Sequence, residues 1–304
     1  MEQGDSVLIA GGTGLVGQRL TKLLLQNGYK VMLLSRKKTT QGDITVYEWN
    51  PAKNAIDDNA LLDADHIINL SGENIAGGRW TPERKSALIS SRTGSNQLLF
   101  DACQRLGRFP KTYITASAIG YYGNRENEIL DEDSDAGSGF LSECCVTWES
   151  GAQKWSDKGV RTVICRIGLV LSNSGGVLAE TLKPLRFGLA TYFGSGKQYN
   201  SWIHIDDLCG ILQLAIEDDE MSGIFNAVAP NPVSNLEFTK TLVRVRRKPC
   251  LMVPAPSFAL HILLGESAQM ILSGSIVSSA KIEQQGFVFL FPELEAALKD
   301  LLNT

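Results

Sequence analysis

The fold of this chain is decided by one stretch, VLIAGGTGLVG at residues 7–17. A short apolar run, three glycines spaced three residues apart and an apolar segment to Leu25 predict a strand, a tight turn and a helix. Gly11 lets the backbone turn sharply, Gly14 leaves room for a pyrophosphate, and Gly17 lets the helix pack on the strand. The free N–H groups of the helix N-terminus would face the phosphates. We therefore expect a dinucleotide site, the alternative being a glycine turn that binds nothing.

The end of the second expected strand, residues 31–34, predicts which dinucleotide binds. The basic run at residues 35–38 follows it, with no acidic residue before Asp43. Sites for NAD usually carry an acidic residue here, whereas sites for NADP carry a cation for the 2′-phosphate. The forked guanidinium of Arg36 suits two-point phosphate binding, with the Ser35 hydroxyl as a second donor. We therefore predict NADP(H), the alternative being a solvated basic loop.

Composition and charge exclude several classes of protein. The chain has 304 residues, 43% hydrophobic and 20% charged, which is typical of a soluble globular protein of one large or two closely joined domains. A formal net charge of −4 argues against nucleic acid or an anionic membrane as partner. The six cysteines form no C-x-x-C pair and no zinc spacing with the three histidines, so we expect free thiols and no metal. The N-terminus is polar and no apolar run reaches bilayer length, so the expected compartment is the cytoplasm.

Strand and helix signals alternate beyond the first motif. Apolar runs predict strands at 66–70, 112–116 and 161–167. One helix is expected to follow Thr81 and run to Leu106, because a capping residue and then a proline precede it; a second is expected at 138–158. Such alternation predicts an α/β protein of Rossmann type, in which helices cover both faces of a doubly wound parallel sheet.

The second half of the chain is less regular. Its expected elements are a glycine-rich stretch at 172–200, a turn and helix at 202–215, a returning strand at 223–228, a helix capped by Ser234 or Asn235 and running to Val245, and a helical tail around loops with Pro254 and Pro256. We therefore predict a dinucleotide-binding domain at 1–171, completed by about 198–228. A smaller, discontinuous C-terminal substrate lobe is expected within 172–304.

Six further motifs extend along almost the whole chain. They are NLSGENI at 69–75, RWT at 79–81, SAIGYYG at 117–123, WE at 148–149, RIGLVL at 166–171 and WIHIDD at 202–207. Together with the glycine motif, they are similar to the extended short-chain dehydrogenase/reductases. More closely, the chain resembles the small atypical branch named the epimerase family proteins, which are related to NAD-dependent epimerases and dehydratases.

This resemblance implies a set of cofactor-binding residues at the carboxyl ends of the strands. They are Gly11, Thr13, Gly14, Leu15 and Val16 at the pyrophosphate, with Gly17 completing the motif; Ser35 and Arg36 at the adenosine; Leu70, Ser71 and Gly72 at the ribose; Arg92 from the long helix; and Val170 beside the nicotinamide. The resemblance also indicates a homodimer that pairs through the helices equivalent to 82–106 and 138–158.

The chain departs from the wider superfamily in its catalytic residues. Those enzymes use a Tyr-x-x-x-Lys pair, in which the lysine and the cofactor ribose lower the tyrosine pKa, together with an upstream serine or threonine. Ser117 matches the serine and would polarise a carbonyl, the alternative being a serine that caps a turn. Counted from Glu149, however, the tyrosine position is Leu141 and the lysine position is Cys145. Ordinary epimerase or dehydrogenase chemistry is therefore in doubt.

Two tyrosines follow Ser117 closely and are the expected substitutes. Tyr121 or Tyr122 would donate the proton, the alternative being that both rings pack. Buried, inert thiols are the expected state of Cys144 and Cys145.

Other polar residues receive weaker predictions. His204 is expected to be structural rather than catalytic, and Asp206 or Asp207 to cap the following helix. Four polar residues near the expected loops would orient an anionic substrate: Glu73, Asn74, Arg79 and Arg186.

These patterns support two hypotheses of function. The first is an NADP(H)-dependent oxidoreductase or isomerase for a carbonyl or sugar-nucleotide substrate, in which Ser117 polarises a carbonyl and Tyr121, Tyr122 or water relays the proton. The second is a non-catalytic NADP(H) sensor that acts through a protein partner, which the missing tyrosine and lysine would suit. We favour the enzyme, because a binding module alone has no need of a substrate lobe.

Overall fold

The computed structural model describes residues 4–37, 44–247 and 249–303, which are built around an eight-stranded sheet. Its strands are β1 (Ser6–Ala10), β2 (Lys30–Ser35), β3 (Thr45–Asn50), β4 (Ala55–Ile56), β5 (His66–Asn69), β6 (Thr112–Ala118), β8 (Arg161–Ile167) and β13 (Gly223–Ala227). They lie in the order β13-β8-β6-β5-β1-β2-β3-β4, and only β3 and β4 pair antiparallel. The predicted doubly wound parallel sheet is thus confirmed.

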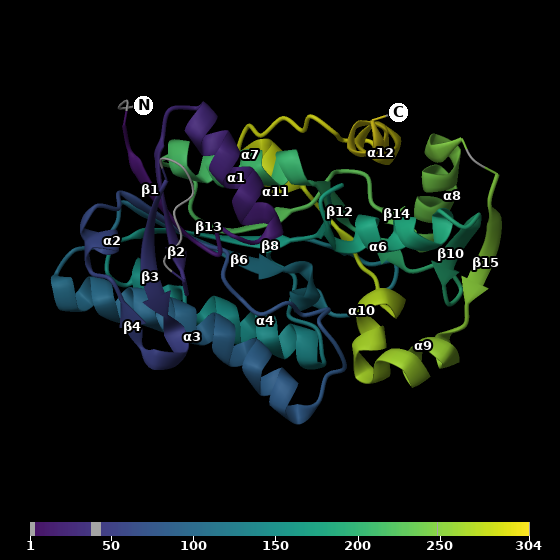
Figure 1. Cartoon of the computed structure of the whole chain (residues 1–304), viewed down its shortest axis with the longest axis horizontal. Coiled ribbons are helices and arrows are strands. Elements are labelled where there is room, and N and C mark those ends of the chain that lie inside the picture. The colour runs from purple at the N-terminus through teal and green to yellow at the C-terminus, as the bar shows by residue number, and fades with distance from the viewer. Residues whose placement is uncertain (1–3, 38–43, 248, 304) are drawn as a thin grey trace.

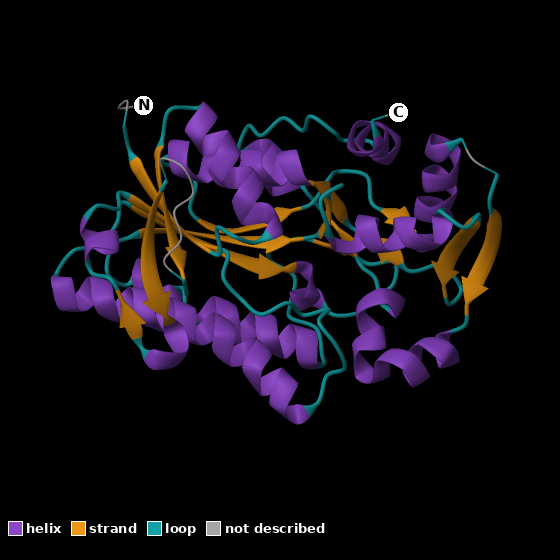
Figure 2. Cartoon of the chain, in the orientation of Figure 1, coloured by secondary structure: helices purple, strands orange, loops and turns teal. Residues whose placement is uncertain are grey.

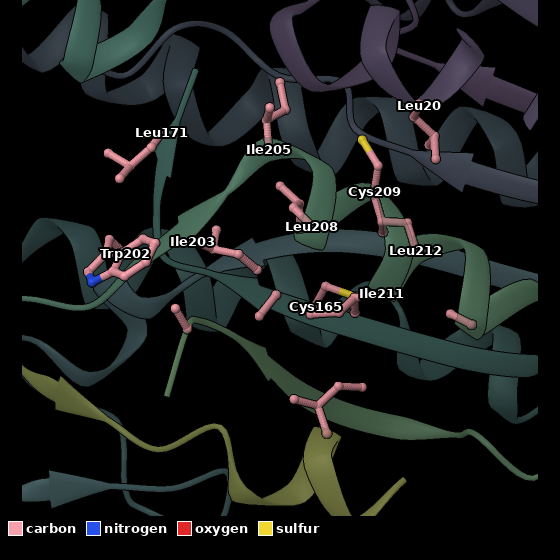
Figure 3. Close-up of a cluster of buried hydrophobic side chains, with 14 of the residues drawn as sticks. Leu20, Cys165, Leu171, Trp202, Ile203, Ile205, Leu208, Cys209, Ile211 and Leu212 are labelled. Carbon is pink, nitrogen blue, oxygen red and sulfur yellow. The ribbon is translucent and has the colours of Figure 1, made fainter. Parts of the chain in front are cut away.

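One face of this sheet is covered by α1 (Leu15–Gln26) and α7 (Ile205–Glu217), which pack against each other (Figure 1). Val7 and Ile9 point toward these helices, because alternate residues of a strand share a face. Figure 3 shows part of the resulting apolar cluster. The labelled members are Leu20, Cys165, Leu171, Trp202, Ile203, Ile205, Leu208, Cys209, Ile211 and Leu212.

The opposite face is covered by α3 (Pro82–Leu106), with α2 (Asn59–Leu62), α4 (Phe140–Ser150) and α5 (Gln153–Ser156) (Figure 2). Leu8 and Ala10 of β1 point to this side. Tyr113 of β6 stacks on Trp155 of α5, with ring centroids 4.1 Å apart. Helices on both faces bury the sheet, as its continuous apolar strands require.

The ends of the predicted helices are partly as expected. Thr81 caps α3 by accepting a hydrogen bond from the Arg84 N–H, and Gly107 ends the helix in the left-handed conformation. The single helix expected at 138–158 is wrong, because α4 ends at Ser150 and α5 begins at Gln153. Gly151 lies at this break, and glycine is a poor helix former.

The cap of α7 also differs from the prediction. His204 caps the helix, since its Nδ1 accepts a hydrogen bond of 3.1 Å from the Asp206 N–H. Asp206 and Asp207 lie in the first turn instead, because the helix begins at Ile205. Asp206 binds Arg19 at 2.6 Å, and the Asp207 carboxylate accepts hydrogen bonds from two backbone N–H groups of the C-terminal tail.

The C-terminal lobe lies beyond the carboxyl ends of the sheet strands (Figure 1). Its larger elements are α6 (Gly176–Leu185), β10 (Leu189–Phe193), α8 (Asn235–Arg246), β15 (Leu251–Ala255), α9 (Ser257–Leu264), α10 (Gln269–Leu272) and α12 (Leu294–Leu302), whereas α11 (Ala280–Gln284) packs on the sheet strand β13. Ser234 caps α8 through the Glu237 N–H. Pro254 lies in β15 rather than in a loop. Among the strands that the structure describes, β15 pairs with β10 alone, and an edge strand tolerates a proline.

Short elements connect the larger ones. They are β7 (Ile129–Leu130), β9 (Leu169–Leu171), β11 (Tyr199–Asn200), β12 (Trp202–His204), β14 (Val233–Ser234), β16 (Ile276–Val277), η1 (Pro51–Lys53), η2 (Ile119–Tyr122) and η3 (Gly265–Ala268). None of the described helices is both long and apolar enough for a bilayer span. Within the same residues, no group of three His, Cys, Asp or Glu side chains is placed to hold a metal ion.

Candidate functional site

The glycine-rich turn lies where the sheet changes direction. β1 has β2 on one side and β5 on the other, and the chain leaves β1 and β5 toward opposite faces. Ligands of open α/β sheets bind at this switch point, outside the carboxyl ends of the strands. Gly11 has a φ of +85°, and a Cβ there would lie 2.8 Å from the Leu70 carbonyl carbon. The turn after β1 therefore packs against the loop after β5, and only glycine allows this contact.

Gly14 and Gly17 shape the entrance to α1. Gly14 is the N-cap residue, and its N–H donates to the Gly11 carbonyl oxygen at 3.0 Å. A Cβ on Gly17 would lie 2.3 Å from that same oxygen, so the helix packs directly on the turn. Thr13 and Gly14 are exposed, and the first turn of α1 carries no acidic residue. Exposed N–H groups without an acid beside them suit a phosphate.

The adenosine and ribose candidates lie at the neighbouring strand ends. Ser35 is half-buried and Arg36 exposed at the end of β2, which is adjacent to β1. The Ser35 hydroxyl accepts a hydrogen bond of 3.2 Å from the Lys37 N–H. Lys38, the last residue of the basic run, lies outside the described residues. Leu70, Ser71 and Gly72 follow β5 directly.

Arg92 is a buried cation beside this loop. It extends from α3, and a Cβ on Gly72 would lie 3.2 Å from its Cζ atom. Its guanidinium donates to the Leu88 and Glu73 carbonyl oxygens and lies 4.9 Å from the Trp148 ring centroid. Burial lowers the pKa of Arg92. Within the described part of the chain it has no carboxylate partner in an ion pair, so its charge is available to an anionic ligand.

Three of the four polar residues expected to orient a substrate have protein partners: Glu73, Asn74 and Arg79. Arg84 pairs with Glu73 and donates to the Asn74 carbonyl oxygen. The Arg79 guanidinium donates to backbone carbonyl oxygens near the end of α9, including Leu263 at 3.0 Å. Arg186 lies at the C-terminal end of α6. These contacts join the loop after β5 to the C-terminal lobe.

Ser117, at the end of β6, forms a hydrogen bond with a carboxylate. It is only 2% exposed, and its hydroxyl donates to Glu149 Oε1 at 2.6 Å. Polarising a carbonyl would require the hydroxyl to give up this hydrogen bond. Glu149 in turn accepts two hydrogen bonds of 2.9 Å from Arg166. Sequence reasoning missed a role for Glu149 and Arg166, although the two residues lie in the quoted motifs WE and RIGLVL.

The Tyr122 hydroxyl also forms hydrogen bonds within the protein. Its side chain is fully buried, and its hydroxyl donates to Asn226 Oδ1 at 2.7 Å and accepts from Arg166 at 3.0 Å. Burial raises the pKa of Tyr122 to about 12. A hydroxyl held in this way positions the arginine, and it has no open path to a substrate.

Tyr121 is placed differently. Its ring is half-buried, with the Arg166 Cζ atom 3.4 Å from the ring centroid. No residue that the structure describes forms a hydrogen bond with its hydroxyl. Of the three residues predicted to be catalytic, Tyr121 alone therefore has a hydroxyl without a hydrogen-bond partner among those residues.

The positions of the missing tyrosine and lysine carry no acid or base. Leu141 packs near Gly120, and Cys145 is buried beside it. Burial raises the pKa of the Cys145 thiol to about 12 and also raises that of Cys144. Both thiols are therefore protonated at neutral pH.

Two cavities lie away from the three catalytic candidates, although Leu15 lines the first of them. One of 380 Å³ opens between α1, the loop after β9, α7 and α12, and the buried ring of His204 lines it. Burial lowers the pKa of His204, which keeps the ring neutral. The other, of 300 Å³, lies between α5, β8 and the edge strand β13. Neither cavity is lined by Ser117, Tyr121 or Tyr122.

Comparison with known proteins gives relatives along the whole chain. The NAD dependent epimerase/dehydratase family matches residues 7–227, and a domain of unknown function (DUF1731) matches residues 255–301. Epimerase family protein YfhF of Bacillus subtilis is 36% identical over 300 residues, covering 98% of each chain. A crystal structure of human epimerase family protein SDR39U1 with NADPH has a TM-score of 0.89 at 34% identity, covering 98% of this chain and 99% of that one. UDP-glucuronic acid 4-epimerase from Bacillus cereus has a TM-score of 0.82 at 17% identity, covering 98% and 99%, which shows a likeness of fold alone.

Proposed function

The chain belongs to the NAD dependent epimerase/dehydratase family, and from that premise we propose that it is an NADP(H)-binding oxidoreductase or epimerase-like enzyme. Its substrate would be a carbonyl compound or a sugar nucleotide. The observation that carries the proposal is the glycine turn at the switch point of the sheet, with Arg36 at the neighbouring strand end. The human relative was crystallised with NADPH, which supports the same coenzyme here.

The residues present fit such a coenzyme. A Cβ on Gly11 or Gly17 would collide with the backbone that shapes the turn, so both glycines are needed for this conformation, and α1 presents N–H groups with no acid beside them. Bound there, the coenzyme would donate or accept hydride. The residues proposed to hold it are Gly11, Thr13, Gly14, Leu15 and Val16 at the pyrophosphate, Ser35 and Arg36 at the 2′-phosphate, Leu70, Ser71 and Gly72 at the ribose, and Arg92 and Val170 toward the nicotinamide.

Proton transfer is assigned to Tyr121. Its hydroxyl is without a hydrogen bond to any described residue, whereas the Ser117 and Tyr122 hydroxyls donate to protein partners. Ser117 is buried and donates to Glu149, so it helps to fix the carboxylate that holds Arg166. Tyr122 positions Arg166.

Calorimetric titration with NADPH and NADH tests the coenzyme. Removing a charged hydrogen bond costs about 1.5–3 kcal/mol, so R36A should weaken NADPH binding by roughly 10- to 150-fold and leave NADH binding unchanged. K37A, which removes the next exposed cation, is the matched control and should behave like the parent protein. If the parent binds neither coenzyme, or R36A binds NADPH as tightly as the parent, the proposal is wrong.

A labelling experiment distinguishes the hypothesis of an enzyme from that of a non-catalytic sensor. NADPH carrying deuterium at the reactive nicotinamide carbon is incubated with a panel of carbonyl compounds and sugar nucleotides. Transfer of deuterium to a product, lost in Y121F, is the expected result. NADPH binding with no transfer to any compound, together with a lobe movement or partner binding that distinguishes NADP⁺ from NADPH, would favour the sensor instead.

A further inference from the structure

We propose that Arg166 activates the Tyr121 hydroxyl, so that these two residues together replace the missing Tyr-x-x-x-Lys pair. The guanidinium lies against the face of the tyrosine ring and would stabilise the negative charge that develops when the phenol gives up its proton. The inference deepens the proposed function, because it names the cation on which proton transfer by Tyr121 depends. Tyr121 would touch the substrate, and Arg166 is a positioning residue that acts through it.

The first support is the geometry of the stack. The Arg166 Cζ atom lies 3.4 Å from the Tyr121 ring centroid, which is van der Waals contact between two planar groups. Arg166 is buried, with only 2% of its side chain exposed. A cation that has lost its water acts more strongly on an aromatic ring than one at the surface. The Tyr121 ring therefore lies in the direct field of the guanidinium.

The second support is that the guanidinium cannot turn away. Glu149 accepts from Nε and Nη2 at 2.9 Å each, while Nη1 donates to the Tyr122 hydroxyl and to the Glu132 carbonyl oxygen. These hydrogen bonds lie along the edges of the planar fork and leave its face to the ring. Burial alone would lower the pKa of Arg166, but the Glu149 carboxylate raises it above the ordinary value. The cation is therefore permanent and fixed in place before any substrate arrives.

The third support is the hydroxyl itself. Within the described residues it has no hydrogen-bond partner, and the half-buried ring leaves it accessible. In the proton step, the Tyr121 O–H bond breaks, its proton passes to the substrate oxygen, and the electron pair stays on the phenolate next to Arg166. In the opposite direction, the phenolate takes the proton of a substrate hydroxyl. No other co-reactant is needed for this step.

The test uses phenylmethanesulfonyl fluoride, which modifies phenolates and needs no knowledge of the substrate. A bond forms between the tyrosine oxygen and sulfur, fluoride leaves, and the phenol proton passes to water. Peptide mass spectrometry gives the rate at each tyrosine. Tyr192 and Tyr199 are internal references, because both are half-buried and neither stacks on a described cation. We expect Tyr121 to react about tenfold faster than either reference.

Variants of Arg166 show whether Tyr121 reacts fast because Arg166 activates it or because its hydroxyl is exposed. R166K keeps a charge but loses the planar stack, and should slow the reaction of Tyr121 about tenfold while Tyr192 and Tyr199 keep their rates. Because a lone change at a buried ion pair can unfold a protein, the double variant R166Q/E149Q removes both charges together and should slow Tyr121 equally. The pH profile of the Tyr121 rate should shift to higher pH in both variants. A structural role alone would leave that profile unchanged.

The outcomes are decisive in either direction. The inference is overturned if Tyr121 reacts no faster than the references, or if its rate and pH profile are the same in the double variant as in the parent. NADPH binding is measured on the same samples. Loss of Tyr121 reactivity with intact binding supports the inference, whereas absence of binding in the parent contradicts the proposed function and leaves the reactivity result standing by itself.

Discussion

Gly17 is the position at which one added methyl group should do most harm to the turn. A Cβ there would lie 2.3 Å from the Gly11 carbonyl oxygen, 2.7 Å from Gly12 Cα and 2.9 Å from Gly12 C. All three are backbone atoms, and the Gly11 oxygen is further held by the hydrogen bond from the Gly14 N–H. G17A must therefore push α1 away from the turn.

The expected loss of stability follows from two opposing effects. Overpacking costs about 1–3 kcal/mol, and backbone atoms that cannot rotate aside place this site at the upper end. Replacing a helical glycine by alanine stabilises the helix by up to about 1 kcal/mol. The free energy of unfolding should therefore fall by about 2 kcal/mol, which lowers the Tm by about 3 °C in a chain of this length.

The assay is urea unfolding of the parent, G17A and G94A, followed by circular dichroism. Gly94 is the matched control, since it also lies in a helix, and a Cβ there would meet no atom within 4 Å. G94A should gain about 0.5–1 kcal/mol. If G17A is as stable as G94A, the close packing of the helix on the turn is not what Gly17 provides.

G14A should fold almost as well as the parent, because a Cβ there approaches only the Gly11 oxygen, at 3.2 Å. It should still bind NADPH roughly 10- to 150-fold more weakly by calorimetry. An unchanged affinity would show that the pyrophosphate does not bind next to Gly14. Burial lowers the pKa of His66 and of His204 below 6.5, so the unfolded chain binds more protons at lower pH. Stability is thus retained above about pH 6.5 and falls as the pH drops toward 5; a urea midpoint that is flat over this range, or equally steep in H204N, would contradict this. In the native protein a thiol-specific reagent should modify Cys250 first, because the other five cysteines are buried; rapid modification of a second thiol would refute that order. A homodimer through α3 and α4 should give twice the monomer mass by light scattering, and a monomer mass at all concentrations would exclude it.

The parts of the fold that depend on local pattern could be predicted from the sequence. The run ending at Gly11 gave both the first strand and the turn, because a strand, a glycine turn and a helix need only neighbouring residues. Thr81 followed by proline marked the start of α3 in the same way. The alternation of strands and helices likewise predicts a parallel sheet with helices on both faces, but not the order of its strands.

Features that depend on distant residues could not be predicted in this way. Ser117 and Glu149 are 32 positions apart, and Glu149 and Arg166 are 17 apart, so no periodicity brings them together. Aspartate side chains favour caps, so the sequence predicts Asp206 or Asp207 as the cap of α7. In the structure the helix already begins at Ile205, and the His204 ring accepts the hydrogen bond from the Asp206 N–H instead. Strand pairing determines which polar side chains come into contact, and this pairing cannot be predicted from a single sequence.

The pairing of β13 with β8 has a consequence for synthesis of the chain on the ribosome. β8 ends at Ile167, but its outer neighbour β13 begins only at Gly223, after α6, β10 and α7 have all been made. A nascent chain released near residue 171 would expose the β8 backbone to any other unpaired strand. The sheet of the nucleotide-binding half is therefore completed only after the chain of the lobe up to β13 has been synthesised. A fragment ending at residue 171 should aggregate, whereas a fragment that includes β13 covers the edge of β8 and should not aggregate in this way.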